Sequence, residues 1–425
     1  MVFRMLPPRH QLVEILTRIY QQRLTTTSGG NLSIKDEDGN IWITPAGVDK
    51  GTLTLEDIVC IQPDGKTVGR HRPSTEFPFH QQIYQARPDL RAIVHAHPLA
   101  LVAWSITRKT PNTALTPHAH HLCGQVGYAP YALTGTPELG TVIANTFEQG
   151  YNVVMLENHG VVTAGTNLLE AFHRFESLEF IAQTQALAQR VGTVKSLRPE
   201  QLEAALQTST WGMLQPHTPA IRELELRQAL CKMAHRAYDQ SLIIGTIGTL
   251  SARLEEDSFL ITPKDVDRRY LSPEDIILVR GNAREAGKML NRAARLHQAI
   301  YARQPHVQFI ISAQPPHALA FAISDAQFDT RLIPESYIVL RDLPRVPYDW
   351  LMTPDKIAET LTAKTPICLI ENDAVVATGA SLLQAFDRLE VAEFSAQAMF
   401  NSLSIGEIVP IEAEHIEALK QKFQL

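Results

Sequence analysis

Three histidines supply the residue type and spacing that could hold a divalent metal ion. His95 and His97 flank one alanine in a short apolar stretch, and His159 lies in a predicted turn before a glycine. If the apolar stretch is a strand, alternation puts His95 and His97 on one face, a few ångströms apart. Three imidazole nitrogens form the donor set of a catalytic site that leaves one coordination position open. An isolated His-x-His pair is also common as a structural or exposed feature, so the pair alone leaves both interpretations open.

The chain repeats itself once. Five segments recur in the same order: 43–50 as 261–268, 53–59 as 271–277, 80–84 as 297–301, 157–160 as 371–374, and 171–174 as 385–388. A period of about 215 residues is much longer than a solenoid repeat, so each copy is expected to be a domain with its own core. We predict a first domain at residues 1–198, a linker at 199–219 and a second domain at 220–425.

The two copies differ at the candidate metal-binding positions. The second copy has Ser312 in place of His95, Gln314 in place of His97, Asp373 in place of His159 and Ala293 in place of Glu76. Neighbouring residues such as Glu157 and Glu371 are the same in both copies. The loss of all four side chains from a recognisable copy is expected if they form one unit, and it is not expected of unrelated core histidines. We therefore predict a metal site in the first copy only.

Patterns of apolar residues predict the elements that must position these side chains. Helices are expected at residues 8–23, 73–86, 99–106 and 168–190, and strands at 31–34, 41–44, 58–62, 92–97, 153–156 and 160–164. A polar helix is expected at residues 200–206, inside the linker. Short strands flanked by helices indicate an α/β sheet that is covered by helices on its faces.

The ordered set of motifs resembles the class II aldolase/adducin family. The matching segments are Gly29–Ser33, Ile43–Gly47, Ser74–Glu76, His95–Pro98 and Glu157–Gly160, with a weaker match over residues 222–400 in the second copy. The resemblance implies an α/β fold of two homologous three-layer α/β/α domains, each with a central, mainly antiparallel sheet. It also implies that His95, His97 and His159 hold Zn²⁺, or another divalent cation such as Mn²⁺ or Co²⁺, with Glu76 near the metal.

The chemistry that the resemblance implies is that of a metal-dependent aldehyde-lyase in carbohydrate metabolism. We expect Glu76 to take a proton from the carbon next to a ketose carbonyl, while the metal stabilises the enediolate. An aldolase then makes or breaks a carbon–carbon bond in a ketose or ketose phosphate. The alternatives on this scaffold are a sugar-phosphate 4-epimerase and a sugar-acid dehydratase or decarboxylase. The alternative of another class is a non-catalytic adducin-like scaffold protein, against which the intact histidines count.

By the same resemblance, a substrate phosphate is held by Ser28, Asn31, Gly47, Ser74 and Thr75. Backbone N–H groups, small hydroxyls and a helix N-terminus near Ser74 suit an anion. Ala46 departs from the family pattern, in which phosphate-binding relatives often have a hydroxyl residue. The same residue types also serve in ordinary turns and caps.

Other polar residues near the motifs have structural interpretations. Glu76 could instead favour the start of the 73–86 helix, where an acidic side chain is stabilising. We expect His118, His120 and His121 in a loop that lines the active-site mouth, and not as primary metal ligands. Tyr128 and Tyr131 are expected to pack in the interior, although either could donate a proton.

The composition indicates a globular protein without affinity for polyanions. Hydrophobic residues make up 44% of the chain and charged residues 20%, and the formal net charge of −6 gives no attraction to nucleic acid or an anionic membrane. No run of about 18 apolar residues predicts a membrane span. Four scattered cysteines without a C-x-x-C pair, together with an N-terminus that lacks a secretory pattern, predict a cytoplasmic protein.

Members of the family commonly form four-fold rings, so the resemblance implies a homo-oligomer. A tandem pair of domains would act as two subunits, and a dimer of the chain would then form a pseudo-four-fold ring. In this arrangement we expect the second copy to be a structural partner that supplies the wall of a site whose metal belongs to the first copy.

Overall fold

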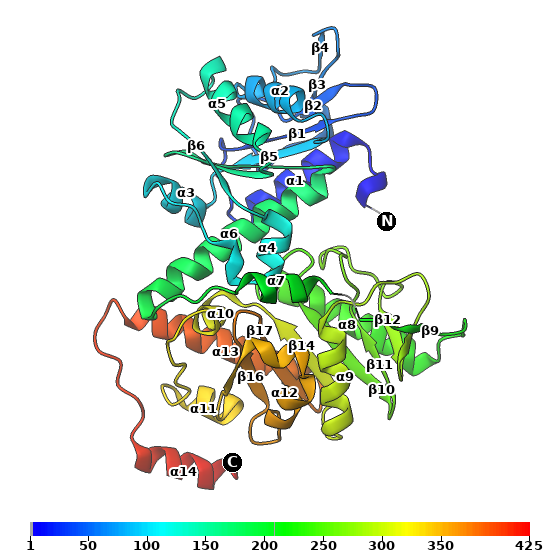
Figure 1. Cartoon of the computed structure of the whole chain (residues 1–425), viewed down its shortest axis with the longest axis vertical. Helices are drawn as coiled ribbons and strands as arrows, with labels where there is room; N and C mark the ends of the chain where they lie inside the picture. The colour runs from blue at the N-terminus through cyan, green and yellow to red at the C-terminus, as the bar shows by residue number, and fades with distance from the viewer. Residues whose placement is uncertain (1–2, 208) are drawn as a thin grey trace. The chain divides into compact units, whose positions relative to one another are not determined.

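The computed structural model describes residues 3–207 and 209–425, shown in Figure 1. Contacts within the chain divide it into two compact units: residues up to Thr113 with His118–Gln183, and Ala114–Pro117 with Thr184–Leu425. Each unit contains one sheet. The predicted limits of the linker, residues 199 and 219, stay a prediction, and this segment contains the expected polar helix, α7 (Pro199–Leu206).

The first unit is an α/β structure around an eight-stranded sheet (Figure 1). Its strands are β1 (Asn31–Lys35), β2 (Ile41–Ile43), β3 (Val59–Ile61), β4 (Thr67–Val68), β5 (Ala92–Ala96), β6 (Gly127–Ala129), β7 (Val153–Leu156) and β8 (Gly160–Gly165). Its helices are α1 (Pro8–Gln21), α2 (Phe77–Ala86), α3 (Leu99–Ile106), α4 (Pro117–Cys123), α5 (Pro137–Glu148) and α6 (Leu168–Val191), the last of which ends in the second unit. The strand order is β4-β3-β2-β1-β5-β8-β7-β6, antiparallel except for the pair β6–β7.

The second unit repeats this plan. Its strands are β9 (Gly212–Met213), β10 (Thr249–Glu255), β11 (Ser258–Ile261), β12 (Ile277–Arg280), β13 (Ala283–Arg284), β14 (Phe309–Ala313), β15 (Arg345–Val346), β16 (Ile367–Ile370) and β17 (Ala374–Gly379). Its helices after α7 are α8 (Ile221–Asp239), α9 (Ala293–Arg303), α10 (Pro316–Ala322), α11 (Pro334–Leu340), α12 (Pro354–Thr360), α13 (Leu382–Ser402) and α14 (Ala413–Phe423). Its order, β15-β16-β17-β14-β10-β11-β12-β13-β9, is the order of the first sheet read in reverse, with β9 added at one edge. The duplication read from the sequence is therefore confirmed in the topology.

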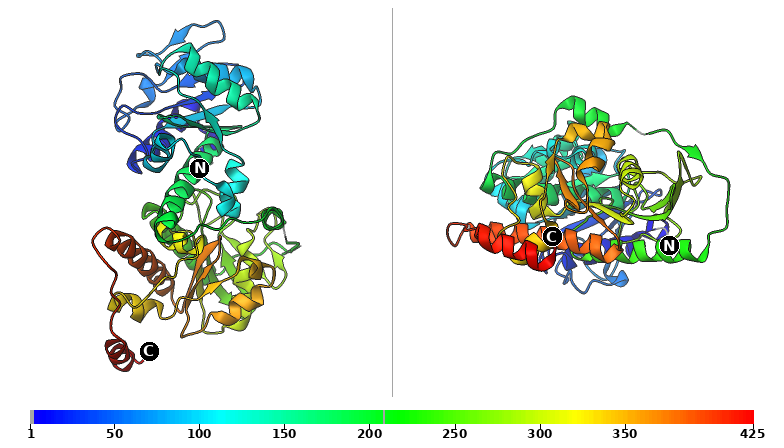
Figure 2. Two further views of the ribbon diagram at one scale, coloured as in Figure 1. Left: turned by 60° about the vertical axis from the view of Figure 1, so that its left-hand side comes forward. Right: turned by 90° about the horizontal axis from the view of Figure 1, so that it is seen from below.

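Helices cover both faces of the first sheet (Figures 1 and 2). On one face α2 and α5 lie side by side, and Phe79, Ile83 and Ile143 pack against strand residues such as Ile93 and Val162. On the other face α1 packs on β1 and β2. Its buried residues Leu12, Ile15, Leu16 and Ile19 have the helical spacing that predicted this element.

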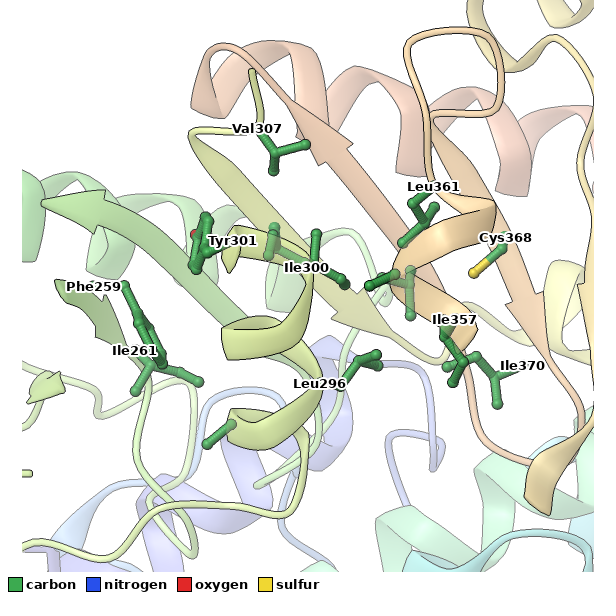
Figure 3. Close-up of a cluster of buried hydrophobic side chains, with 14 of the residues drawn as sticks. Phe259, Ile261, Leu296, Ile300, Tyr301, Val307, Ile357, Leu361, Cys368 and Ile370 are labelled. Carbon is green, nitrogen blue, oxygen red and sulfur yellow. The ribbon is translucent and has the colours of Figure 1, made fainter. Parts of the chain in front are cut away.

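The second sheet has an equivalent core, seen in Figure 3. Leu296 and Ile300 of α9 pack in one cluster with Phe259 of β11, and Ile357 of α12 belongs to the same cluster as Ile370 of β16. Burial of such apolar side chains is the main favourable term in folding, so each sheet has its own source of stability.

Two elements differ from the sequence prediction. The helix expected from Pro73 begins at Phe77, because Ser74 N donates to Thr44 O and Pro73 forms a bridge with Pro45, which hold residues 73 and 74 against the loop after β2. Residues 118–121 form part of α4 and not a loop. Pro117 stands at the first helical position of α4, where its fixed φ favours a helix.

In the part of the chain that the structure describes, no helix combines the length and the apolar character that a membrane crossing requires. Cys60, Cys123, Cys231 and Cys368 are buried free thiols. This agrees with the predicted absence of a disulfide framework.

Candidate metal centre

The three predicted histidine ligands converge at one end of the first sheet. His95 lies in β5, His97 follows that strand, and His159 lies in the turn between β7 and β8. Because β5 and β8 are adjacent, the turn brings His159 beside the β5 pair. The ring centroids are 4.8 Å apart for His95 and His97 and 4.9 Å for the other two pairs. Among the described residues, this is the group of His, Cys, Asp or Glu side chains whose donor atoms could hold an ion, all within 4.8 Å of one another.

The turn that carries His159 depends on its neighbours. Asn158 has a φ of 52°, a left-handed conformation that Asn tolerates better than most residues. Gly160 lies so close to β5 that a Cβ atom there would be 2.6 Å from Ala96 O and 2.8 Å from His97 Cδ2. Glycine is therefore needed after His159 because the two backbones pack closely there.

His95 is oriented by the backbone of the neighbouring strand. Its Nδ1 lies 2.9 Å from Val161 O, and since a carbonyl only accepts, Nδ1 carries the proton in this bond. Its Nε2 therefore faces the cluster, 3.1 Å from His97 Nε2. Two nitrogens on one tetrahedral zinc ion lie about 3.3 Å apart, given Zn–N bonds of about 2.0–2.1 Å. The donor set and its orientation fit a zinc-type divalent cation.

Glu76 lies against the histidines. Its Oε2 is 3.2 Å from His95 Nε2 and accepts a 2.7 Å hydrogen bond from Asn31 Nδ2, while Oε1 is 3.5 Å from His159 Nε2. Glu76 is the residue that precedes α2, but its side chain makes no capping hydrogen bond to the helix. The geometry therefore favours a role beside the histidines over a role at the helix start.

The charges of the four side chains are coupled. Burial lowers the pKa of His97 to about 3 and that of His159 to about 4, with a further contribution from His95. Burial opposes charge on His95 and Glu76 too, but their attraction outweighs it, so the pKa of His95 is raised and that of Glu76 lies well below its usual range. His97 and His159 are thus neutral at neutral pH, the form that binds a metal.

The predicted phosphate-binding residues surround this cluster. A bridge between Pro45 and Pro73 brings the loop of Gly47 beside Ser74 and Thr75, and Ser28 precedes a glycine whose Cα lies close to His97. Ser28, Gly47 and Thr75 are exposed, whereas Ser74 and Asn31 are buried. Asn31 differs from the other four, because both ends of its side-chain amide are bound to protein groups.

A buried lysine lies beneath the same loop. Lys50 Nζ donates to Pro45 O at 2.8 Å, and burial lowers its pKa to about 8. No sequence pattern pointed to this residue as part of the site. It supplies positive charge next to the loop of Gly47, which suits an anion.

Of the other polar candidates, His118 lies 3.5 Å from Ser177 Oγ. Tyr131 was expected to be buried but has 62% of its surface exposed, because it follows β6 in an open segment. Tyr128 is half-buried.

Sequence reasoning missed a buried polar network next to Glu76. Ser33, His80 and Tyr84 are linked by hydrogen bonds of 2.7 Å, and His80 Nε2 lies 2.5 Å from Asn31 Oδ1. The pattern that could have revealed it is the repeat itself. The second copy keeps Ser251, His297 and Tyr301 at the equivalent positions, and polar residues retained inside a core are usually bonded to each other.

The chain matches the family described as Class II Aldolase and Adducin N-terminal domain over residues 10–186 and again over residues 228–400. It is 34% identical over 173 residues to an L-fuculose phosphate aldolase of Methanococcus vannielii, a match that covers 41% of this chain and 92% of the relative. It is 32% identical over 182 residues to a 3-oxo-tetronate 4-phosphate decarboxylase of Haemophilus influenzae, covering 42% of this chain and 86% of that protein. An L-fuculose 1-phosphate aldolase of known structure aligns with 33% identity and a TM-score of 0.43, covering 46% of this chain and 93% of its own.

The first matched region contains the first sheet, and the second matched region contains the strands of the second sheet except β9. The resemblance read from the motifs, the tandem duplication and the predicted fold class are all confirmed. The chain therefore belongs to the class II aldolase and adducin N-terminal domain family and carries that domain twice.

Proposed function

We propose that the first copy is a divalent-metal-dependent aldehyde-lyase that makes or breaks a carbon–carbon bond in a ketose or ketose phosphate. The observation that carries the proposal is the position of the Glu76 carboxylate beside His95 and His159. Its Oε1 accepts no hydrogen bond from the residues that the structure describes. A buried carboxylate with an uncommitted oxygen next to metal-binding imidazoles is suited to act as a general base.

His95, His97 and His159 would hold the cation, which would act as a Lewis acid on the oxygens of the ketose. In the bond-forming direction, Glu76 Oε1 would accept the proton from the carbon next to the carbonyl, the electron pair left on that carbon would form the new bond to the aldehyde carbon, and the aldehyde oxygen would take a proton from solvent to become a hydroxyl. In the bond-breaking direction, that hydroxyl would lose its proton to solvent, the carbon–carbon bond would break to release the aldehyde, and the carboxyl group of Glu76 would return a proton to the carbon. Its low pKa keeps Glu76 ionised, which is the form that can accept a proton.

A phosphate group on the substrate would be held by residues near the cluster, of which Ser28, Gly47 and Thr75 are exposed and Ser74 is buried. Ser28, Ser74 and Thr75 offer hydroxyls, and Gly47 offers a backbone N–H on an open loop. Lys50 adds a positive charge under that loop. Asn31 was predicted in this set, but its amide serves Glu76, so we propose it as a support of the base instead.

A decarboxylase acting on a sugar-acid phosphate is the second candidate, and the Haemophilus influenzae relative favours it. Loss of carbon dioxide from a 3-oxo acid leaves the same kind of electron pair next to a carbonyl, so the same side chains would serve. A 4-epimerase would also use them.

Product analysis tests the proposal. The purified full chain, supplied with Zn²⁺, Mn²⁺ or Co²⁺, would be incubated with ketose 1-phosphates, unphosphorylated ketoses and 3-oxo sugar-acid phosphates. Release of an aldehyde from a ketose substrate is expected, and Glu76→Gln should reduce it by about 10²- to 10⁴-fold while the bound metal is retained. Release of carbon dioxide alone would replace the lyase by the decarboxylase, and a fully active Glu76→Gln variant would contradict the assignment of the base.

The predicted ring of two chains is part of the proposal. Size-exclusion chromatography with light scattering should give the mass of a dimer of the full chain. A monomer at all concentrations would rule out the pseudo-four-fold arrangement.

A further inference from the structure

We propose that His80, acting through Asn31, is a positioning residue for the Glu76 carboxylate. This inference rests on the proposed function, in which Glu76 is the base. The geometry behind it is an unbroken line of buried hydrogen bonds that runs from Glu76 through Asn31, His80 and Ser33 to Tyr84. His80, Ser33 and Tyr84 lie in the interior, and His80 and Ser33 have no exposed surface.

The chemistry of the groups fixes the direction of each bond. Asn31 Nδ2 donates to Glu76 Oε2 at 2.7 Å, so Asn31 Oδ1 points the other way and can only accept. His80 Nε2, 2.5 Å away, must therefore carry the proton and donate it. His80 is neutral because burial lowers its pKa to about 3, which makes Nδ1 an acceptor for Ser33 Oγ at 2.7 Å. Ser33 Oγ then accepts from the Tyr84 hydroxyl at 2.7 Å.

This line of bonds has one consequence for the site. If His80 donates to Asn31 Oδ1, the Asn31 amide cannot turn, and its N–H group stays directed at Glu76 Oε2. One carboxylate oxygen is then held while the other, Oε1, remains available beside His159. Groups that orient a reacting side chain in this way contribute through geometry, because a small misplacement slows proton transfer.

The second copy provides an internal comparison. Ser251, His297 and Tyr301 make the same bonds, with 2.7 Å from Ser251 Oγ to both His297 Nδ1 and the Tyr301 hydroxyl. Here His297 Nε2 is 2.8 Å from Ser312 Oγ, and no carboxylate follows, since Ala293 replaces Glu76. The Ser–His–Tyr part therefore supports the fold in both copies, and the extension through Asn31 to a carboxylate is specific to the first. His297 is a matched control for His80.

The experiment compares His80→Met with His297→Met in the full chain. Each variant loses a buried bond at each ring nitrogen, to Ser33 and Asn31 or to Ser251 and Ser312, so a similar loss of thermal stability is expected. Only His80→Met should reduce kcat, by roughly 10- to 100-fold with little change in KM and in the metal content. His80→Gln, whose N–H group can still donate to Asn31, should recover part of the rate. Equal rates for the two methionine variants would overturn the proposal.

A second measurement does not need turnover and separates this inference from the proposed function. In the zinc-loaded chain with ¹⁵N-labelled histidine, NMR should show His80 with its proton on Nε2, slow to exchange with water. Glu76→Gln should shift this signal through Asn31, while the His297 signal stays unchanged. An unshifted His80 signal would overturn the coupling. A shifted signal in a protein that turns over no substrate would leave the coupling intact and refute the proposed reaction instead.

Discussion

At the same end of each sheet, the two copies carry different polar groups. In the first, Glu76 faces His95 and His159. In the second, Asp373 occupies the turn position of His159 and forms an ion pair with Arg292, while Gln314 Nε2 donates to the backbone oxygen of Asp373.

Both arrangements bury a carboxylate, and a buried carboxylate is costly unless a positive charge accompanies it. In the first copy a bound cation would provide that charge, or protonated His95 when no cation is bound. In the second copy the Arg292 guanidinium provides it from within the chain. The second copy thus has an internal cation at the place where a bound cation is proposed for the first copy, and it is not simply a copy with missing ligands.

The residue that follows this turn position also differs between the two copies. Gly160 is needed in the first copy because a Cβ atom would collide with β5 and the His97 ring. The second copy has Ala374 at this position, buried at the start of β17. Replacement of the imidazole by Gln314 removed one of the groups that the extra methyl would meet.

The two copies also differ at a buried basic residue, which is Lys50 in the first copy and Arg268 in the second. Lys50 makes one bond, to Pro45 O, whereas Arg268 at the equivalent position donates to Pro263 O, Gly248 O and Val266 O. The guanidinium ties the loop of the second copy more firmly. The lysine has in common with the arginine only the hydrogen bond to the equivalent proline oxygen, Pro45 O or Pro263 O.

The largest expected effect is on metal content. Because only the first copy has the donor set, the wild-type chain should bind about one divalent ion, and His95→Ala with His97→Ala should bind none. Elemental mass spectrometry of the protein purified without added metal measures this. Gln314→Ala in the second copy is the control and should retain the ion. Two ions per wild-type chain would contradict the proposed difference between the copies, since the second copy would then hold a cation as well.

The second-largest effect is expected on stability, when the ion pair between Arg292 and Asp373 of the second copy is removed. Asp373→Asn leaves Arg292 without its partner. Since the Arg292 side chain is 33% exposed, the cost is expected at or below the lower end for a buried pair, roughly 2–3 kcal/mol. Urea denaturation measures it. The double variant Arg292→Met, Asp373→Asn should recover part of the loss, and a double variant as unstable as the sum of the single ones would show that the pair is not coupled.

The buried histidines common to both copies predict that the free energy of unfolding depends on pH. Burial lowers the pKa of His80 and of His297 to about 3, below the ordinary 6.5. Between these values the unfolded chain binds the proton and the folded chain does not, so stability is lost as the pH falls below 6.5. At pH 5 the loss is roughly 2 kcal/mol for each histidine, at about 1.4 kcal/mol per pH unit.

Urea denaturation of the metal-stripped chain at several pH values checks this expectation. His80→Met and His297→Met should each flatten the acid dependence by a similar amount. A variant with an unchanged slope would show that its histidine is not the titrating group.

The smallest expected effect concerns the helix that follows each site strand. The Glu179 carboxylate accepts from Ala100 N and Leu101 N at 2.9 Å, and Glu393 accepts from His317 N and Ala318 N in the second copy. Glu179→Gln should cost about 0.5–1 kcal/mol, because the charge at the helix start is lost while one acceptor oxygen remains. Glu393→Gln should cost slightly more, since Glu393 also bonds His317 Nδ1 at 2.6 Å. Thermal unfolding of both variants tests whether the loss of stability is larger for Glu393→Gln than for Glu179→Gln.

Much of the fold followed from local patterns. The α1 spacing, the strands β7 and β8 and the long helix α6 were predicted within one or two residues, because alternation and helical periodicity are written in neighbouring residues. The start of α2 was wrong because a contact with the loop after β2 holds Ser74 in extended chain. The helix α4 was missed because its polar histidines give no amphipathic period.

Some features of the candidate site could likewise be predicted from the sequence, and others could not. The sequence by itself determined the duplication, the family and the set of residues that changed together between the copies, since each of these is a comparison of one stretch of chain with another. Which nitrogen of His95 faces the cluster, how Asn31 links Glu76 to His80, and the pairing of Arg292 with Asp373 were decided only by the tertiary structure. Each of these contacts joins residues 45 or more positions apart, and hydrogen bonds and ion pairs depend on distance and angle in space, which spacing along the chain does not encode.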